Sequence, residues 1–154
     1  MPKDMPDNVA AARAALAHLD IDENAAAIRS KSRDFFWYSP ILKEKMDHLE
    51  ADFVVSPRSE AEVIEVLKVC FAHDVPVTTR GAGTGNYGQA MPLAGGCVMH
   101  LHHLDKVRHV EPGRVICEPG ILLKDLDAYC IEHAGHELRM FSSTWATASI
   151  GGFI

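Results

Sequence analysis

The spacing of apolar residues predicts a strand–helix–strand unit in the middle of the chain. A short apolar run begins at Asp52 and leads into a turn that reaches Ser59. From Val63 to Phe71, apolar residues recur at intervals of three and four, which is typical of an amphipathic helix. The run VPVTT, residues 75–79, predicts a second strand. Because a helix of about 15 residues joins the two strands, we expect them to be parallel.

The start of this helix carries the pattern of a capping box. Ser59 is followed three residues later by Glu62. In a capping box the serine hydroxyl accepts a hydrogen bond from a helix amide, and the glutamate accepts one from the amide of the serine. The helix is therefore predicted to begin beside Ser59 and to run to His73.

The second half of the chain predicts a strand, a hairpin and another helix. GCVMHLHHL, residues 96–104, has the apolar character of a strand. KVRHVEPGRVICEPG, residues 106–120, predicts a hairpin with Pro112 and Gly113 in its turn. ILLKDLDAYCIEHAG predicts a helix that ends at Gly135 in the left-handed conformation. The residues expected on its packing face are Leu122, Leu126, Cys130 and His133.

The pattern is weaker before residue 51. Residues 8–33 are rich in alanine and carry a thin apolar stripe, which predicts one or two surface helices. The aromatic cluster DFFWYSPIL, residues 34–42, follows. We expect this cluster to lie on the core, because most buried aromatic residues serve packing, and a ligand-facing role is the alternative. The chain is thus divided into a helical and aromatic lead-in, residues 1–50, and one domain, residues 51–154.

Composition and charge narrow the class of function. The chain has 154 residues, of which 47% are hydrophobic, and its formal net charge is −6. This length suffices for one domain with a core, and the acidic balance argues against a nucleic-acid partner. Without a signal peptide or an apolar run near the ~20 residues of a membrane span, we expect a cytoplasmic protein. The cysteines form no C-x-x-C pair and the histidines complete no zinc site, so we expect reduced thiols and no bound metal.

A glycine-rich stretch after the second predicted strand carries the main candidate chemistry. Residues 83–88 spell G-x-G-x-x-G, the fingerprint of dinucleotide binding. In a Rossmann fold the last glycine of this fingerprint opens a helix. Here Pro92 and the pair Gly95–Gly96 follow, so a strand is expected and nicotinamide binding is disfavoured. Small residues still allow backbone amides to turn inward and hold an anion, so we predict a ligand-binding loop.

The predicted ligand-binding loop belongs to one of four sequence motifs that follow one another along the chain: VVSPRSEAEVIEVLKVC, VPVTTRGAGTGNYGQAMP, VICEPGILLKDLDAYC and STWATASIGG. In this order they resemble the FAD-binding domain of the vanillyl-alcohol oxidase and p-cresol methylhydroxylase family. The glycolate oxidase D-subunit and D-lactate dehydrogenases belong to that family. The resemblance covers residues 51–154. It implies an α+β fold of two layers, with a small parallel βαβ subdomain followed by the start of a second, mixed or antiparallel sheet.

The resemblance also implies FAD as the cofactor. The loop from Arg80 to Asn86 matches the family's pyrophosphate loop, and the motif STWATASIGG matches a second loop that contacts the flavin. The residues expected to bind the cofactor are Arg80, Gly81, Ala82, Gly83, Thr84, Gly85, Asn86, Gln89, Ala90, Pro119, Gly120, Ser143, Thr144, Thr147, Ala148, Gly151 and Gly152. Some members attach the flavin through a histidine, and Thr84 occupies that position here. We therefore expect noncovalent FAD.

The implied activity is that of an FAD-dependent oxidoreductase. The expected reaction is oxidation of a 2-hydroxy acid, such as glycolate or lactate, by hydride transfer to flavin N5. No residue of this chain is identified as a catalytic acid or base. In the family a substrate domain follows, so we expect an N-terminal fragment whose small-molecule substrate binds to a missing C-terminal domain. Open sheet edges would favour self-association or a partner subunit.

One alternative belongs to a different class of function. The chain would then be a non-catalytic fragment of a split or truncated flavoprotein that binds a nucleotide or a partner chain.

Overall fold

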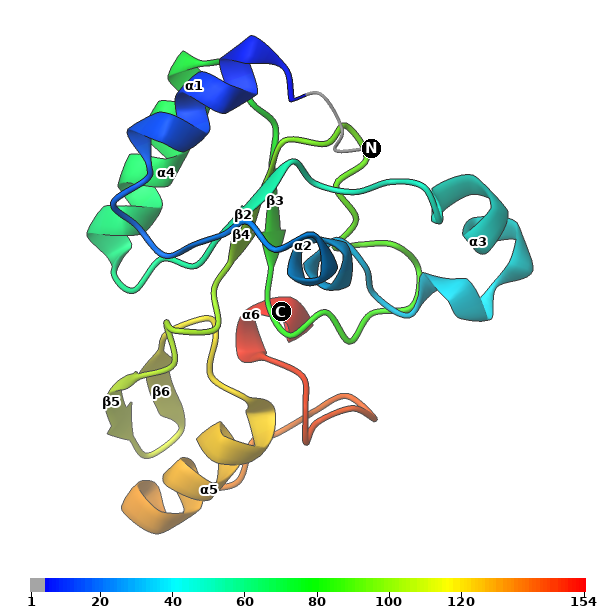
Figure 1. The fold of residues 1–154 in the computed structure, drawn as a ribbon. Coiled ribbons are helices and arrows are strands. Elements are labelled where there is room, and N and C mark those ends of the chain that lie inside the picture. Colours follow the sequence, from blue (N-terminus) through cyan, green and yellow to red (C-terminus); the bar gives the residue numbers. More distant parts are fainter. Residues whose placement is uncertain (1–4) are drawn as a thin grey trace.

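The computed structural model describes residues 5–154 and contains two separate sheets (Figure 1). The first sheet has the strand order β1-β2-β4-β3. Its strands are β1 (Ile21–Asp22), β2 (Phe53–Val55), β3 (Val77–Arg80) and β4 (Cys97–His100). The second sheet is the hairpin of β5 and β6. The architecture is the predicted one, a parallel βαβ unit followed by the start of an antiparallel sheet.

The strands β2 and β3 are parallel, as predicted, but they are not neighbours. Both pair with β4, so that Val54 and Thr78 lie on opposite sides of Val98. All four residues of β4 are buried, whereas β3 is only partly buried. Three of the four residues of β4 are apolar, and such a strand takes the central place because both faces of a parallel sheet are covered.

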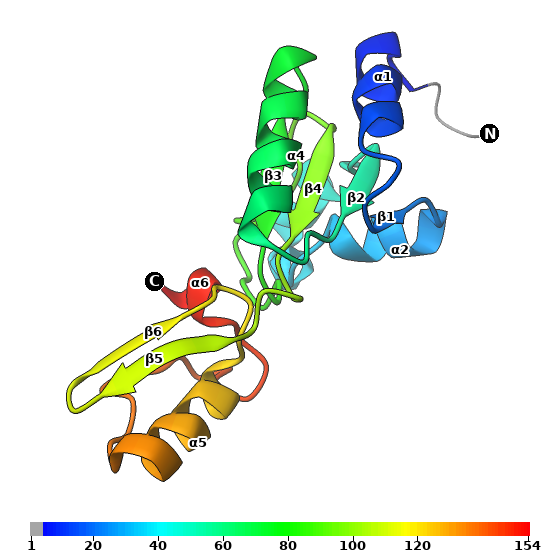
Figure 2. The same ribbon diagram turned by 90° about the vertical axis from the view of Figure 1, so that its left-hand side faces the viewer.

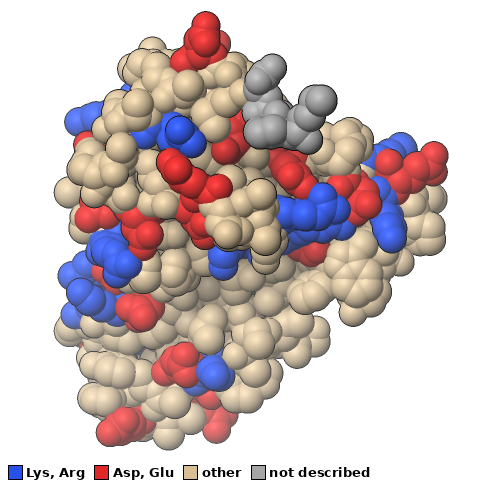
Figure 3. All heavy atoms as spheres, viewed as in Figure 1, with Lys and Arg blue, Asp and Glu red and all other residues tan. Residues whose placement is uncertain are grey.

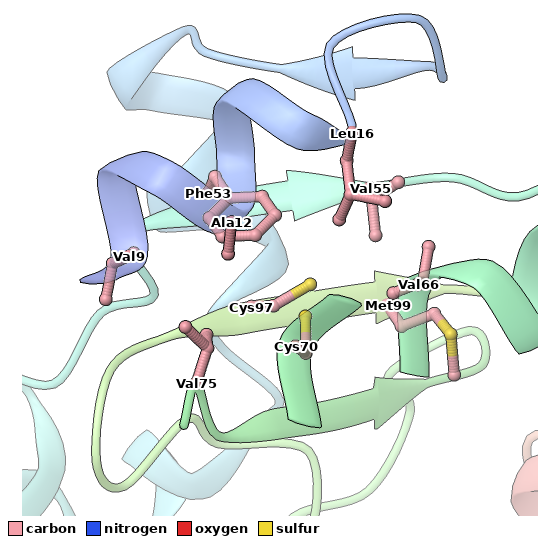
Figure 4. Packing of buried hydrophobic residues seen from close by; sticks show 10 residues of the cluster. All are labelled: Val9, Ala12, Leu16, Phe53, Val55, Val66, Cys70, Val75, Cys97 and Met99. Atoms are coloured by element: carbon pink, nitrogen blue, oxygen red, sulfur yellow. The ribbon is translucent and has the colours of Figure 1, made fainter. Parts of the chain in front are cut away.

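Helices cover both faces of the first sheet (Figures 1 and 2). The helices α1 (Asp7–Ala15) and α4 (Glu60–Ala72) lie on one face, and α2 (Ala25–Lys31) lies on the other. The helix α1 is a surface helix with a thin apolar stripe, as predicted: Val9 and Ala12 are buried in the main core (Figure 4), and most of its other residues are exposed. Alanine has so small a side chain that α1 can pack closely against α4 and the sheet.

The capping box of α4 forms only in part. The hydroxyl of Ser59 accepts a hydrogen bond from the amide of Glu62 at 3.2 Å, as predicted. The Glu62 carboxylate, however, accepts the amide of Arg58 at 2.8 Å and not that of Ser59. A glutamate side chain is long enough to reach the residue before the cap. The amides of Arg58 and Glu62 at the start of the helix therefore both have an acceptor.

The second unit consists of the hairpin and α5 (Leu123–Ala134), which share a small core. The strands β5 (Val107–Glu111) and β6 (Arg114–Cys117) are antiparallel, and Gly113 in the turn has φ +81°. The predicted left-handed end of the helix is confirmed at Gly135, where φ is +65°.

The packing face of α5 differs from the predicted one. Its buried residues are Leu123, Leu126 and Cys130. Leu122 is the residue that precedes the helix, and His133 is exposed. The Nδ1 atom of His133 lies 3.0 Å from the carbonyl oxygen of Tyr129 on the same helix. At the surface the imidazole also keeps its contact with water, which burial in an apolar core would remove.

The aromatic cluster is split between core and surface. It forms a short 3-10 helix, η1 (Phe36–Tyr38), followed by α3 (Pro40–Met46). Phe36 is fully buried, whereas Phe35 and Trp37 are 41% and 42% exposed. The prediction that the cluster lies on the core therefore holds for one ring only, because consecutive residues of a tight turn point in different directions.

Acidic and basic side chains are interspersed on the face shown in Figure 3. All four cysteines are free, and the sulfur atoms of Cys70 and Cys97 point toward each other in the main core (Figure 4). Within residues 5–154, no helix combines the length and the apolar character that crossing a membrane requires.

Candidate functional site

A cavity of about 250 Å³ opens beside the carboxyl ends of β3 and β4. This edge is where open sheets of parallel strands commonly bind ligands. The start of the helix α6 (Ile150–Phe153) also lines the cavity, so two segments distant in sequence meet there. Figure 1 shows α6 beside the loop that follows β3. The predicted residues that line it are Gly81, Ala82, Gly83, Thr84, Gly85, Gln89, Ala90, Pro119, Gly151 and Gly152.

The glycine loop carries unused backbone donors beside this cavity. Within the described residues, the amides of Gly83, Thr84, Gly85 and Asn86 donate to no protein acceptor. Gly83 has φ +70°, which glycine adopts without strain. Consecutive unpartnered amides around a concave surface form a nest for anionic oxygens, such as those of a phosphate.

Arg80 supports this loop from beneath instead of lining the cavity. Its Nη1 donates to the carbonyls of Lys31 at 2.9 Å and Arg33 at 2.6 Å. The atoms nearest to a Cβ placed on Gly83 all belong to the Arg80 guanidinium. Burial lowers the pKa of Arg80 and Asp34 raises it, but a guanidinium remains charged. A fixed positive charge thus lies directly under the anion nest.

Ser149 joins the two loops and was not among the predicted residues. It is 3% exposed, it lines the cavity, and its Oγ accepts the amide of Ala82 at 3.2 Å. A Cβ on Gly81 would overlap this hydroxyl, so Gly81 is needed for the close approach. Ser149 lies two residues before Gly151 in STWATASIGG, and its place in this motif is the signal that could have identified it.

Several other predicted residues lie outside this cavity. Asn86, Ser143 and Thr144 are exposed, and Thr147 lines a second cavity. Ala148 is buried, and its carbonyl accepts the amide of Leu123 at 2.9 Å.

Gly120 serves the backbone packing around the cavity. It is buried, and its amide donates to the carbonyl of Leu104 at 2.7 Å. A Cβ there would collide with the carbonyls of Leu101 and Leu104. The position therefore demands glycine for a structural reason, whatever the cofactor contacts.

The second cavity, of about 470 Å³, lies beside the first. Both are lined by Asp34 and by Ala82, Gly83 and Thr84 of the glycine loop. Phe35 and Trp37 line the second cavity, so these two rings face a ligand-sized space and not the core. Asp34, Thr79 and Leu101 line the first cavity without having been predicted, because no motif marks them.

His100, at the end of β4, is a buried neutral group below the loop. It lies opposite Arg80 in the sheet and is 5% exposed. Burial, with a smaller contribution from Lys31, lowers the pKa of His100 to about 3. The rings of His100 and His102 stack at 4.1 Å, but no three metal-ligating side chains are grouped within residues 5–154.

The lowered pKa of His100 predicts a loss of stability in acid. The folded protein keeps this imidazole neutral, whereas the unfolded chain protonates it near pH 6.5, so stability falls as the pH drops from 6.5 toward 3. His100→Gln is expected to remove about 3 kcal/mol of this loss by pH 4. Urea unfolding midpoints at pH 7, 5 and 4 measure it, with the exposed His136→Gln as control. Parallel pH profiles of wild type and His100→Gln would contradict the assignment.

The family's sequence model, described as "FAD binding domain", matches residues 51–154. The chain belongs to the FAD-binding domain family. The expected cofactor, FAD, follows from this membership. The lining of the cavity fits it, since unpartnered amides and close-packed glycines lie beside a buried cation, groups that a diphosphate requires. No helix follows Gly88, which excludes the Rossmann alternative.

Curated relatives are flavin enzymes of far greater length. Glycolate oxidase subunit GlcD of Bacillus subtilis is 29% identical over 105 residues, which are 67% of this chain and 22% of that protein. D-lactate dehydrogenase [cytochrome] of Arabidopsis thaliana is 38% identical over 84 residues, 53% of this chain and 15% of that protein. An uncharacterized FAD-linked oxidoreductase of Mycobacterium tuberculosis is 36% identical over 78 residues, 49% and 17%. The chain thus spans 15–22% of the length of these relatives.

Solved structures show the same fold. Alkyldihydroxyacetonephosphate synthase superposes with a TM-score of 0.79 at 18% identity, over 98% of this chain and 31% of that one. p-Cresol methylhydroxylase with substrate bound gives a TM-score of 0.70 at 19% identity, over 96% and 29%. The predicted fold, the p-cresol methylhydroxylase type of FAD-binding domain, is confirmed.

Proposed function

We propose that this chain holds noncovalent FAD in an oxidoreductase that oxidises a 2-hydroxy acid. The observation that carries the proposal is the nest of unpartnered amides at residues 83–86, set above the Arg80 guanidinium. The 2-hydroxy acid is favoured because relatives are named as a glycolate oxidase subunit and D-lactate dehydrogenases. When bound, FAD supplies the hydride acceptor, its N5 atom.

The residues of this chain bind and orient the cofactor. The amides of the glycine loop donate to the diphosphate oxygens, and the Arg80 charge beneath them adds attraction that solvent does not screen. Ser149 holds the loop against α6 through the amide of Ala82. A loop held in advance loses little conformational freedom when the ligand arrives, which favours tight binding.

Thr84 supports the noncovalent mode of binding. It lines both cavities at the position that matches the flavin-attaching histidine of some family members. Its hydroxyl is a much weaker nucleophile than an imidazole nitrogen. Thr84 therefore contributes a hydrogen-bonding group and no covalent link.

The substrate is proposed to bind to parts of the enzyme that the longer relatives contain. The two-stranded β5–β6 sheet has open edges, which further strands or a second subunit would cover. The non-catalytic nucleotide-binding fragment remains the second candidate. Reduction of the bound flavin by glycolate or D-lactate, measured as bleaching of its visible absorbance, would contradict that candidate.

A titration of the purified chain with FAD tests the proposal. We expect saturable quenching of flavin fluorescence with one FAD per chain, because stacking against protein groups and exclusion of water change the flavin's surroundings. After acid precipitation, all yellow colour should stay in the supernatant, as noncovalent binding requires. Absence of saturable binding, both to this chain and to one extended to the full length of the relatives, would contradict the assignment.

A further inference from the structure

The glycine loop is fastened to a segment that precedes the matched domain. The amide of Phe35 donates to the carbonyl of Gly85 at 2.8 Å, and the amide of Gly88 donates to the carboxylate of Asp34 at 2.9 Å. From the loop side, Arg80 donates to the carbonyls of Lys31 and Arg33. Residues 31–36 and 80–88 are thus hydrogen-bonded in both directions, although the family match begins only at residue 51.

Asp34 is the one acidic side chain in this connection that faces the cavity. It is 5% exposed and lines both cavities beside the glycine loop. One carboxylate oxygen accepts the amide of Phe36 at 2.8 Å, and the other accepts the amide of Gly88. A buried carboxylate is tolerated only when its oxygens are satisfied and its charge is balanced. Here two amides and the nearby Arg80 do both.

A carboxylate beside a phosphate nest would weaken binding if it served no other purpose, since like charges repel. Asp34 accepts the amide of Gly88 and Gln89 accepts that of Tyr87, whereas the amides of residues 83–86 have no protein partner among the described residues. Gly88, the residue that Asp34 holds, has φ +81°, a left-handed conformation that favours glycine. The presence of a carboxylate beside the loop is best explained if Asp34 is needed to hold the glycine loop in its shape.

We propose that Asp34 is a positioning residue of the FAD site: it holds the Gly88 end of the glycine loop, so that the amides of residues 83–86 face the cofactor's phosphates. The lead-in segment around Asp34 is then a working part of the cofactor site. The inference rests on the proposed binding of FAD and names a residue that acts on the loop from outside the matched domain.

The test compares Asp34→Asn with a matched control. In Asp34→Asn the new amide group meets the N–H of Gly88, so that two donors face each other or the hydrogen bond to Phe36 is lost instead. Asp52 is the control, because its carboxylate accepts the amide of Gly96 at 2.6 Å and lies outside both cavities. Each variant is titrated with FAD and with ADP at a temperature at which circular dichroism shows it fully folded.

Asp34→Asn is expected to weaken the binding of FAD and of ADP by the same factor, about 10- to 100-fold. Asp52→Asn should stay within about twofold of wild type. Amide hydrogen exchange, a readout that general destabilisation would not confine to one place, should rise at Gly88, whose amide Asp34 accepts, in Asp34→Asn only. If Asp34→Asn does not fold, Asp34→Glu replaces it, and its displaced carboxylate should still cost at least about threefold in affinity.

The two proposals fail in different ways. Wild-type affinity in the folded Asp34 variant overturns the role of Asp34 alone, and so does a loss that affects FAD but not ADP, since that would indicate a contact with the flavin half. A wild-type chain that binds no FAD overturns the proposed function together with this inference.

Discussion

Gly83→Val is expected to weaken FAD binding by at least about 100-fold and to leave the fold intact. Gly83 has φ +70°, a conformation that a β-branched residue adopts only under strain. Its side chain would also meet the Arg80 guanidinium. That guanidinium cannot move aside freely, because the carbonyls of Lys31 and Arg33 hold it. The loop must therefore change shape, and the nest of amides is lost.

The matched control for this prediction is Gly113→Val. Gly113 also has a positive φ, +81°, but a Cβ there meets no atom within 4 Å and the turn lies away from the cavity. Both variants carry the same type of backbone strain, so Gly113→Val measures the shift in thermal unfolding that this strain causes by itself, while only Gly83→Val loses FAD in a fluorescence titration. Equal FAD affinities would mean that the loop is a structural turn and not a phosphate cradle.

Gly120→Ala is expected to lower the free energy of unfolding by about 3–5 kcal/mol. A methyl group at this buried position would overlap the carbonyl oxygens of Leu101 and Leu104, and backbone atoms cannot rotate away as a side chain can. Relief requires separation of the segment around Gly120 from the end of β4, which breaks the hydrogen bond from the Gly120 amide to Leu104. Urea unfolding of the two proteins measures the difference.

Gly113→Ala is the control for this second prediction. It introduces the same methyl group in open space and should cost only about 1 kcal/mol, from the left-handed backbone alone. The comparison also bears on the role that the family resemblance implies for Gly120. A stable Gly120→Ala protein with reduced FAD affinity would show that this glycine serves the cofactor directly and that the structural explanation is wrong.

Much of the fold could be predicted because its signals are local. The spacing of apolar residues in α4, the turn at Gly113 and the end of α5 at Gly135 each depend on neighbouring residues only. The glycine loop could be predicted for the same reason. Pro92 also indicated that no helix follows the loop, as a Rossmann fold would require. The order of strands was less accessible, since the place of β4 between β2 and β3 depends on burial of the whole sheet.

The candidate site combines both kinds of information. The sequence was enough to predict that a glycine-rich loop follows a strand and that a second small-residue motif, STWATASIGG, lies far along the chain. The contact of Ser149 with Ala82, the position of Arg80 beneath the loop and the hydrogen bond from Gly88 to Asp34 became visible in the folded structure alone. The physical reason is that amide donors and steric limits of glycine are properties of single residues, whereas a hydrogen bond between distant segments exists only after the core has brought them together.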